Sequence, residues 1–358
     1  MQPVFPEDPR SQDEKSNWVQ RFESANATRA VFGTNRWAKS IALAVDVKYF
    51  IDDFRKEDEF CGRPVIRLDD ADRDIMTLST AIGRPLSARE RLRSRGVNSL
   101  DFYSFLRYTT LNVDRIDYLS DGINWDFSNS VQLRRFRGSL SDDESRETFD
   151  RVTSLRRDLD LEAMVVFSDR QADQYFEPFL RLDDDCTFLD VGAFDGYTTV
   201  CARKKFGTRL KCHLFEPSPT MFEALKARFA DNEGVTLHPI GLADRPQRLC
   251  FDYAGSASRI GVGSSSIEVD SLDRLQLAAA DLIKVDVEGS EQLFLEGAQD
   301  TIKRYQPQLA LACYHSNRQF VEVFDRAHEL LPDARVYLRH YTEGFAETDV
   351  FFVPPRFW

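Results

Sequence analysis

Residues 187–199 read Thr187-Phe188-Leu189-Asp190-Val191-Gly192-Ala193-Phe194-Asp195-Gly196-Tyr197-Thr198-Thr199, and this stretch decides the fold of the second half of the chain. An apolar run ends in an acidic residue, small residues follow, and a helical pattern then begins. This order is typical of a buried parallel strand that leads through a tight turn into a helix, where α/β sheets bind nucleotides. Gly192 allows a sharp turn and the close approach of a ligand, and Gly196 clears space where the helix starts.

Two acids make the mouth of this turn negative, which argues against a pyrophosphate ligand. Asp190 and Asp195 stand on either side of the first glycine. Two carboxylates beside a helix N-terminus suit a ligand that carries an amino group, a sulfonium and ribose hydroxyls. S-adenosylmethionine is such a ligand. On this stretch alone, the alternative is a glycine turn in an unrelated α/β protein.

Two later strand ends also carry acids. Glu216 follows an apolar run and lies 20 residues beyond Gly196, the offset expected of an acid that accepts hydrogen bonds from ribose hydroxyls. Asp286 and Glu288 stand at the end of the strand predicted at 281–286 and precede another helical pattern. The sequence therefore predicts several acidic strand ends at one edge of a sheet.

At this point the sequence resembles the FkbM-type S-adenosylmethionine-dependent methyltransferases. The matching segments run in order through the C-terminal half: Asp173-Gln174-Tyr175-Phe176, 190–199, Phe215-Glu216-Pro217, Ser271-Leu272-Asp273, Lys284-Val285-Asp286-Val287-Glu288-Gly289, Tyr314-His315 and Arg339-His340-Tyr341. Each segment is short, but the ordered set is specific. The resemblance implies an α/β class I methyltransferase domain, with a Rossmann-like, mostly parallel, doubly wound sheet and an antiparallel hairpin at its edge.

The composition argues against a nucleic-acid-binding protein. The formal net charge of −12 and the pI near 5.1 disfavour phosphate contacts, which depend on Lys and Arg. No apolar run approaches the roughly 18 residues of a membrane span, and the first residues lack the features of a signal peptide. The six cysteines form no CxxC pair, so we expect reduced thiols, a cytoplasmic location and no zinc site. A homo-oligomer stays an open alternative.

Length and pattern divide the chain into parts. At 358 residues, two domains are expected. We predict an N-terminal arm at 1–27, a smaller Rossmann-like domain at 28–130, a helical connector at 131–182 and the methyltransferase domain at 183–358. The connector is expected to contain helices at 146–161 and 175–180.

The first half has a degraded nucleotide-binding fingerprint. Gly33 follows a predicted strand, but Asn35 and Ala38 stand where the second and third glycines of the fingerprint would be. Asp52 and Asp53 keep the acidic end of the second strand. This pattern favours a structural or substrate-recognition domain, and nucleotide binding is the alternative.

Strands and helices alternate in the second half, as a doubly wound sheet requires. Strands are predicted at 187–191, 210–215, 235–240, 281–286 and 308–314, and helices at 219–229, 290–303 and 317–331. Residues 334–340 and 348–353 suit the edge hairpin. Residues 247–270 are predicted as two extended segments around a loop at 255–266, which could order over a bound cofactor or serve as a plain connector.

The acidic strand ends and the glycine turn provide candidate residues for binding S-adenosylmethionine. Asp190, Gly192 and Gly196 would shape the methionine end, and Glu216 would hold the ribose. Asp244 follows the third strand, where the adenine usually lies in such proteins. The full candidate set is Asp190, Gly192, Ala193, Asp195, Gly196, Thr198, Glu216 and Asp244.

The candidate catalytic residues are His315, Asp286 and Glu288. A neutral imidazole suits a base near neutral pH, although a structural histidine is the alternative for His315. His340 is a second histidine for which a structural role is favoured. No metal is expected. If a divalent cation binds, Asp286, Glu288 and Asp273 are its candidate ligands, although the same acids could bind sugar hydroxyls or cap a helix.

Two functions follow from this sequence. The favoured one is a methyltransferase that transfers the methyl group of S-adenosylmethionine to a hydroxyl of a small molecule, with a sugar, a glycan or a secondary metabolite implied by the resemblance. The alternative is a non-catalytic nucleotide- or glycan-binding protein with two Rossmann-like halves.

Overall fold

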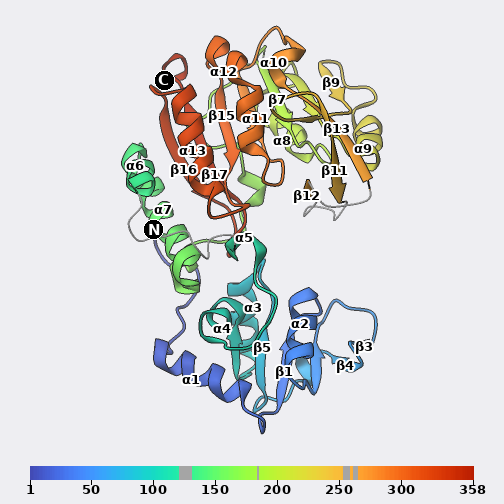
Figure 1. Ribbon diagram of the computed structural model, residues 1–358, viewed down its shortest axis with the longest axis vertical. Helices are drawn as coiled ribbons and strands as arrows, with labels where there is room; N and C mark the ends of the chain where they lie inside the picture. Colours follow the sequence, from blue (N-terminus) through green and yellow to red (C-terminus); the bar gives the residue numbers. More distant parts are fainter. Residues whose placement is uncertain (121–130, 184, 253–258, 261–264) are drawn as a thin grey trace. The chain divides into compact units, whose positions relative to one another are not determined.

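The computed structural model describes residues 1–120, 131–183, 185–252, 259–260 and 265–358 (Figure 1). The chain forms two compact units. The N-terminal unit comprises Met1–Ile123, Glu147–Gln171 and Tyr341–Ala346, and the C-terminal unit comprises Asn124–Arg146, Ala172–His340 and Glu347–Trp358. These divisions differ from the predicted boundaries, because parts of the expected connector and of the last 20 residues are shared between the units.

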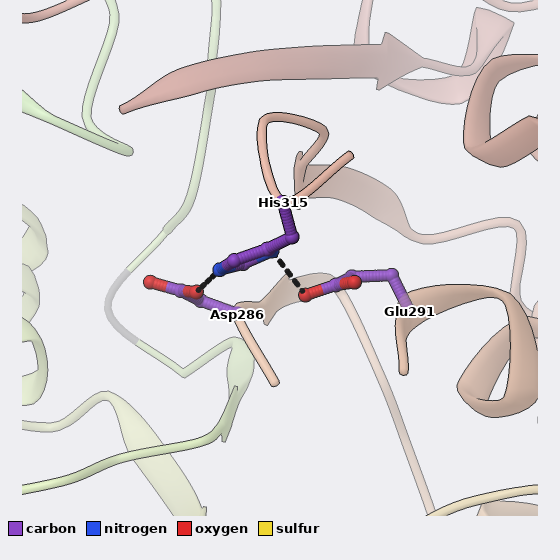
Figure 2. Close-up of side chains that lie close together, drawn as sticks. All are labelled: Asp286, Glu291 and His315. Carbon is purple, nitrogen blue, oxygen red and sulfur yellow. Dashed lines mark ion pairs between the residues drawn. The ribbon is translucent and has the colours of Figure 1, made fainter. Parts of the chain in front are cut away.

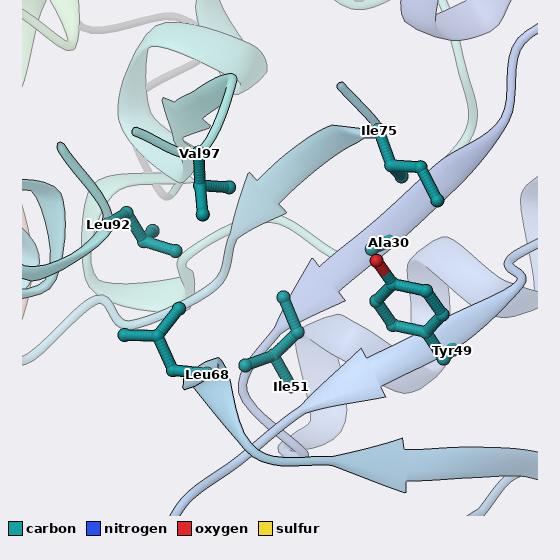
Figure 3. Close-up of a cluster of buried hydrophobic side chains, with 7 residues drawn as sticks. All are labelled: Ala30, Tyr49, Ile51, Leu68, Ile75, Leu92 and Val97. Carbon is teal, nitrogen blue, oxygen red and sulfur yellow. The ribbon is translucent and has the colours of Figure 1, made fainter. Parts of the chain in front are cut away.

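The N-terminal unit is built on a six-stranded sheet in the order β3-β4-β2-β1-β5-β6, in which only β3 and β4 pair antiparallel among the described residues. The strands are β1 Arg29–Phe32, β2 Tyr49–Ile51, β3 Glu59–Phe60, β4 Arg63–Ile66, β5 Met76–Ser79 and β6 Ser99–Asp101. The helices are α1 Gln12–Glu23, α2 Arg36–Ala44, α3 Pro85–Ser94, α4 Phe102–Tyr108 and α5 Asp117–Ser120. One of its cores comprises Ala30, Tyr49, Ile51, Leu68, Ile75, Leu92 and Val97 (Figure 3).

The first residues are not a simple arm. Helix α1 begins with a capping box in which Ser11 and Glu14 exchange hydrogen bonds. Trp18, Val19 and Phe22 are buried on one face of this helix, at helical spacing. Residues 12–23 are therefore a packed part of the N-terminal unit.

The C-terminal unit contains a seven-stranded sheet in the order β16-β17-β15-β14-β7-β8-β9. Its strands are β7 Thr187–Val191, β8 Lys211–Phe215, β9 Val235–His238, β14 Leu282–Val285, β15 Gln308–Ala312, β16 Arg335–His340 and β17 Thr348–Val353. The first five are parallel, and β17 pairs antiparallel with β15 and β16. The predicted doubly wound sheet with an edge hairpin is thus confirmed.

Helices connect these strands. They are α8 Tyr197–Phe206, α9 Pro219–Phe229, α10 Leu272–Leu275, α11 Glu291–Gly297, α12 Gln299–Tyr305 and α13 Gln319–Leu330. Between the two halves of the sequence lie α6 Val131–Ser139 and α7 Asp143–Asp158. Short 3-10 helices occur at Leu68–Asp70, Leu161–Met164, Gln171–Asp173 and Pro355–Phe357. Among the described residues, none of the helices is long and apolar enough to cross a bilayer.

Three of the predicted helices need correction, one in the second half and two in the expected connector. Residues 290–303 form two helices, α11 and α12, with the break at Ala298. The break lies beside Gly297, on which a Cβ would lie 2.0 Å from the backbone oxygen of Ala243. Residues 174–180 form turns and no helix, and the helix predicted at 146–161 is α7, which starts and ends three residues earlier.

The two extended segments predicted at 247–270 are confirmed. β11 Gln247–Asp252 and β13 Ser265–Asp270 pair antiparallel in a small sheet of order β10-β13-β11-β12, with β10 Gly241–Leu242 and β12 Arg259–Ile260. Most of the predicted loop at 255–266 lies outside the described residues.

Candidate active site

The strand order identifies the edge of the sheet at which a ligand is expected. The chain proceeds from β7 to β8 and β9 on one side, and then returns to β14 and β15 on the other side of β7. Open α/β sheets bind ligands outside the carboxyl ends of the strands at such a reversal. The turns after β7 and β14 are therefore the two central parts of the candidate site.

Two glycines in the turn after β7 are required by close packing. Gly192 and Gly196 have left-handed backbones, with φ of +75° and +78°. A Cβ on Gly192 would lie 2.0 Å from the backbone oxygen of Asp286, so this turn packs directly on the turn after β14. A Cβ on Gly196 would lie 2.5 Å from the Phe229 ring in α9. The absence of a side chain at Gly192 thus leaves room for the backbone at Asp286, and its absence at Gly196 leaves room for Phe229 of α9.

Asp190 is held by a buried ion pair below the turn. It is fully buried, its Oδ2 accepts a hydrogen bond from the Thr199 hydroxyl at 2.8 Å, and its Oδ1 lies 3.2 Å from Lys284 Nζ. Lys284 also donates to the backbone oxygen of Gly192 at 2.7 Å. Burial would lower the pKa of Lys284, but Asp190 and Asp286 outweigh this effect and raise it, so the ammonium group stays charged. Asp190 therefore supports the turn from beneath.

Glu216, at the end of β8, braces the same turn from the other side. Its Oε2 accepts the backbone N–H of Phe194 at 2.9 Å, and its Oε1 accepts that of Ser218 at 2.8 Å. Burial raises the pKa of this carboxyl, and the two N–H donors oppose that effect. Each oxygen keeps lone pairs beyond these bonds, which is what a ribose acceptor needs.

Three further candidate residues lie in or next to this turn. Ala193 is buried and its N–H donates to the backbone oxygen of Phe215 at 3.1 Å. Asp195 accepts the Tyr197 N–H at 3.0 Å and pairs with Arg228 at 3.1 Å. Thr198 is half-buried in the first turn of α8.

Asp244 lies after β10, next to the small sheet. Its Oδ1 accepts a hydrogen bond from the Gln247 side chain at 3.0 Å, and its Oδ2 pairs with Arg245 at 3.1 Å. This position agrees with the expectation that it follows the third strand of the large sheet.

The turn after β14, the start of α11 and the end of β15 bring one histidine and three acids together. Figure 2 shows His315 between two of these acids, Asp286 and Glu291. His315 Nδ1 lies 3.2 Å from Glu291 Oε1, and His315 Nε2 lies 3.6 Å from Asp286 Oδ1 and 3.4 Å from Glu288 Oε2. All three predicted catalytic residues are thus neighbours. Glu291, which the sequence analysis did not select, is the fourth member.

These carboxylates control the charge of the imidazole. Burial would lower the pKa of His315, but Glu291, Glu288 and Asp286 outweigh it and raise this pKa well above its ordinary value. In turn, burial raises the pKa of Glu288, and His315 opposes the rise. The three neighbouring carboxylates therefore favour the imidazolium form of His315.

Asp286, Glu291 and His315 are close enough together to be considered as ligands of a metal ion. One ligand atom from each can be chosen so that all lie within 4.8 Å of one another. However, Asp286 approaches Nε2 and Glu291 approaches Nδ1, so the two carboxylates flank opposite nitrogens of one ring (Figure 2). Glu291 Oε1 also accepts the Val287 N–H at 2.9 Å. The geometry fits an ion-paired histidine better than three ligands around one cation.

Asp273 and His340 do not belong to this group. The carboxylate of Asp273 accepts the backbone N–H groups of Asp300 and Thr301 at 3.0 and 2.8 Å, and so caps α12. His340 is buried in the edge hairpin, and its Nδ1 lies 2.8 Å from the Thr348 hydroxyl. Both side chains have structural partners at these positions.

A second set of polar side chains continues the site toward β17. The Tyr175 hydroxyl donates to Asp286 Oδ2 at 2.9 Å. The Gln174 amide donates to Glu347 Oε2 at 2.7 Å and to Asp349 Oδ2 at 3.0 Å. Burial and the neighbouring Asp286 raise the pKa of Glu347 to about 7, and burial together with Glu347 raises that of Asp349 well above its usual value.

Backbone strain is concentrated around these turns. Tyr175, Phe194, Glu288 and Glu347 have positive φ values of 67°, 49°, 54° and 64°. Side chains other than glycine seldom adopt this region, and such residues cluster at functional sites when the surrounding structure holds them. The turns after β7 and β14, which contain Phe194 and Glu288, therefore have a constrained backbone. The same holds for the neighbouring positions Tyr175 and Glu347.

Sequence reasoning missed Glu291, Gln319, Glu347 and Asp349. A signal existed for Gln319, because Ser316 and Gln319 have the spacing of a capping box, and the Ser316 hydroxyl does accept the Gln319 N–H at 2.9 Å. Glu347 and Asp349 gave no such signal, because only the pairing of β17 with β15 brings them to the site.

The α/β fold of the C-terminal unit agrees with the fold that the sequence resemblance implies. Residues 190–343 match the family model described as a methyltransferase FkbM domain, which confirms the resemblance found in the sequence. This segment is therefore similar to the FkbM-type methyltransferase domains.

The solved structures agree with the fold. The structure of the methyltransferase FkbM from Methylobacillus flagellatus matches with a TM-score of 0.74 and 24% identity, over 93% of each chain. Other matches include fibrillarin from Aeropyrum pernix with bound S-adenosyl-L-methionine, with a TM-score of 0.32 and 11% identity over 51% of this chain and 71% of that one. An O-methyltransferase from Thermotoga maritima matches with a TM-score of 0.34 and 12% identity, over 51% and 67%. No curated protein sequence matches this chain.

Proposed function

We propose that this protein is an S-adenosylmethionine-dependent O-methyltransferase that acts on a hydroxyl of a sugar, a glycan or a secondary metabolite. The observation that carries the proposal is the direct packing of the turn at Gly192 on the turn at Asp286. It brings a turn suited to the donor next to a histidine suited to deprotonate an acceptor. The family resemblance supplies the acceptor class.

The residues divide into a donor side and an acceptor side. The turn at Gly192 and Gly196 would hold the methionine end of the donor, and Glu216 the ribose. On the other side, Asp286 and Glu288 would bind acceptor hydroxyls, since each carboxylate is about one fifth exposed at 22% and 21%. A bound donor would supply an electrophilic methyl group on a sulfonium.

His315 would remove the acceptor proton. As the carbon–oxygen bond forms and the carbon–sulfur bond breaks, the hydroxyl proton passes to Nε2, and the positive charge moves from sulfur to the imidazole. Only the neutral imidazole can act, so the rate should rise with pH. Because the surrounding carboxylates raise the pKa of His315, the rise should lie above the pH of about 6.5 typical of a free imidazole.

Calorimetry with S-adenosylmethionine and the His315→Ala variant test this proposal. The parent protein should bind the donor, and the variant should keep that affinity while turnover falls by about 10²–10⁴-fold, the usual contribution of a general base. No binding at millimolar donor would favour the alternative of a non-catalytic binding protein. Loss of activity with a chelator, restored by magnesium or manganese, would transfer the role of His315 to a metal site.

A further inference from the structure

Glu291, Gln319 and His315 are joined in a closed circuit of polar contacts. The backbone N–H of His315 donates to Gln319 Oε1 at 2.8 Å. The Gln319 side-chain amide donates to Glu291 Oε2, and Glu291 Oε1 lies 3.2 Å from His315 Nδ1. Glu291 is 0% exposed and the other two residues are 6% exposed. The circuit therefore fixes both the backbone and the ring of His315, away from water.

The three members come from three different elements. Glu291 is the first residue of α11, Gln319 is the first residue of α13, and His315 follows β15. A carboxylate is favoured at the first turn of a helix by the helix dipole. A fully buried carboxylate is nevertheless costly unless donors and a positive charge compensate it. The Gln319 amide and the imidazolium form of His315 supply that compensation.

We propose that Glu291 and Gln319 are positioning residues for methyl transfer. Glu291 keeps the ring proton on Nδ1, so that Nε2 faces the acceptor, and Gln319 holds Glu291 and the backbone of His315 in register. This inference rests on the proposed function. When Nε2 takes the acceptor proton, the imidazolium that forms already lies against the carboxylate of Glu291.

Other charges act on the same ring. The groups that face it from the packed elements are Glu291 on α11, Asp286 and Glu288 in the turn after β14, and Glu347 before β17. The ring of Tyr314 lies beside it in a tilted arrangement, with the two ring centroids 4.1 Å apart. Of these described groups, Glu291 alone approaches Nδ1 and is fully buried. Its removal should therefore affect the tautomer, whereas Asp286 and Glu288 affect only the Nε2 side.

The test is a titration of the histidine side chains in full-length, ¹⁵N-labelled protein. His315→Gln assigns the signal, and at a pH above the pKa of His315 the parent ring should keep its one remaining proton on Nδ1. In Glu291→Gln the pKa of His315 should fall, the midpoint of the pH–rate profile should move down with it, and kcat should decrease by about 10²–10⁴-fold. Glu296→Gln, on the same helix with a side chain 39% exposed, is the matched control and should change neither.

Two further variants keep the test decisive if Glu291→Gln does not fold. Glu291→Asp retains the charge and should preserve the raised pKa of His315. Gln319→Met removes both hydrogen bonds while Glu291 keeps its charge, so it should lower kcat with little change in KM. An unchanged His315 titration in Glu291→Gln, or a parent ring protonated on Nε2, would overturn the proposal. Failure to bind S-adenosylmethionine would instead refute the proposed function and leave the titration result standing.

Discussion

The backbone oxygen of Asp286 occupies the space in which a side chain on Gly192 would lie, since it is only 2.0 Å from the point that a Cβ would take there. Two turns that are far apart in the sequence are therefore in backbone contact. The first turn belongs to the candidate donor side and the second to the candidate acceptor side, so their distance is fixed by main-chain packing.

Gly192→Ala should therefore destabilise the protein more than its backbone conformation alone requires. An alanine in the left-handed region costs about 1–2 kcal/mol, and the collision with Asp286 adds to this. Gly234→Ala is the matched control, because its φ is +84° but its Cβ would meet its nearest neighbour at 3.6 Å. Urea unfolding should show a clearly larger loss for Gly192→Ala, with weaker donor binding. Equal losses of unfolding free energy in Gly192→Ala and Gly234→Ala would mean that the turns at Gly192 and Asp286 can move apart without a loss of stability.

Glu216→Ala should weaken S-adenosylmethionine binding by about 1.5–3 kcal/mol, the usual value of hydrogen bonds to a charged group. It also removes the acceptor of the Phe194 and Ser218 N–H groups, so some loss of thermal stability is expected. Glu223→Ala, whose side chain is 71% exposed on α9, is the control. Calorimetry on both variants decides the matter, and an unchanged affinity in Glu216→Ala would refute the ribose assignment.

Glu347→Gln should make stability less dependent on pH. Burial and Asp286 raise the pKa of Glu347 from 4.5 to about 7, so the folded state holds this proton to a higher pH than the unfolded state. The free energy of unfolding should then fall as pH rises from about 4.5 to 7, by up to about 3 kcal/mol from this group. Denaturant unfolding at pH 5 and pH 8 should show the parent losing more than the variant. Glu329→Gln, 56% exposed, should behave as the parent does.

The N-terminal unit should not bind a nicotinamide dinucleotide. Asn35 Oδ1 accepts the Ala38 N–H at 3.0 Å, and its Nδ2 donates to the Thr80 backbone oxygen at 2.9 Å. The amide of Asn35 thereby connects the start of α2 with the segment after β5. The strand order reverses between β1 and β5, and the phosphates of a dinucleotide would bind at this point. Calorimetry of the full chain with the dinucleotide should show no heat beyond dilution. Saturable binding that Asn35→Gly strengthens would reverse this interpretation.

Local sequence signals predicted those helices and strands whose ends are marked by residues within or directly next to them. The strand at 187–191 and the helix at 219–229 agree with β7 and α9 residue for residue, because an apolar run and a Ser218 cap with Pro219 mark their limits. The break between α11 and α12 could not be predicted. It lies at Ala298, beside Gly297, whose close approach to Ala243 is a contact between segments far apart in the sequence.

The same distinction applies to the site. The resemblance and the acidic strand ends located Asp286, Glu288 and His315, and the structure does bring them together. It did not reveal Glu291 as a partner of His315, because an acid in the first turn of a helix is also an ordinary helix-stabilising residue. Only the position of the ring beside α11 separates the two roles.

Lys284 connects the candidate donor side of the site with the candidate acceptor side. Its ammonium group contacts Asp190 and the Gly192 carbonyl on one side, and lies 5.4 Å from the centre of the Tyr175 ring on the other. Tyr175 in turn donates to Asp286. In the proposed function, a donor that moves Lys284 would also act on Tyr175 and Asp286 on the acceptor side, so binding of the donor and of the acceptor would be coupled. By linkage, whatever factor the donor imposes on acceptor affinity, the acceptor imposes on the donor.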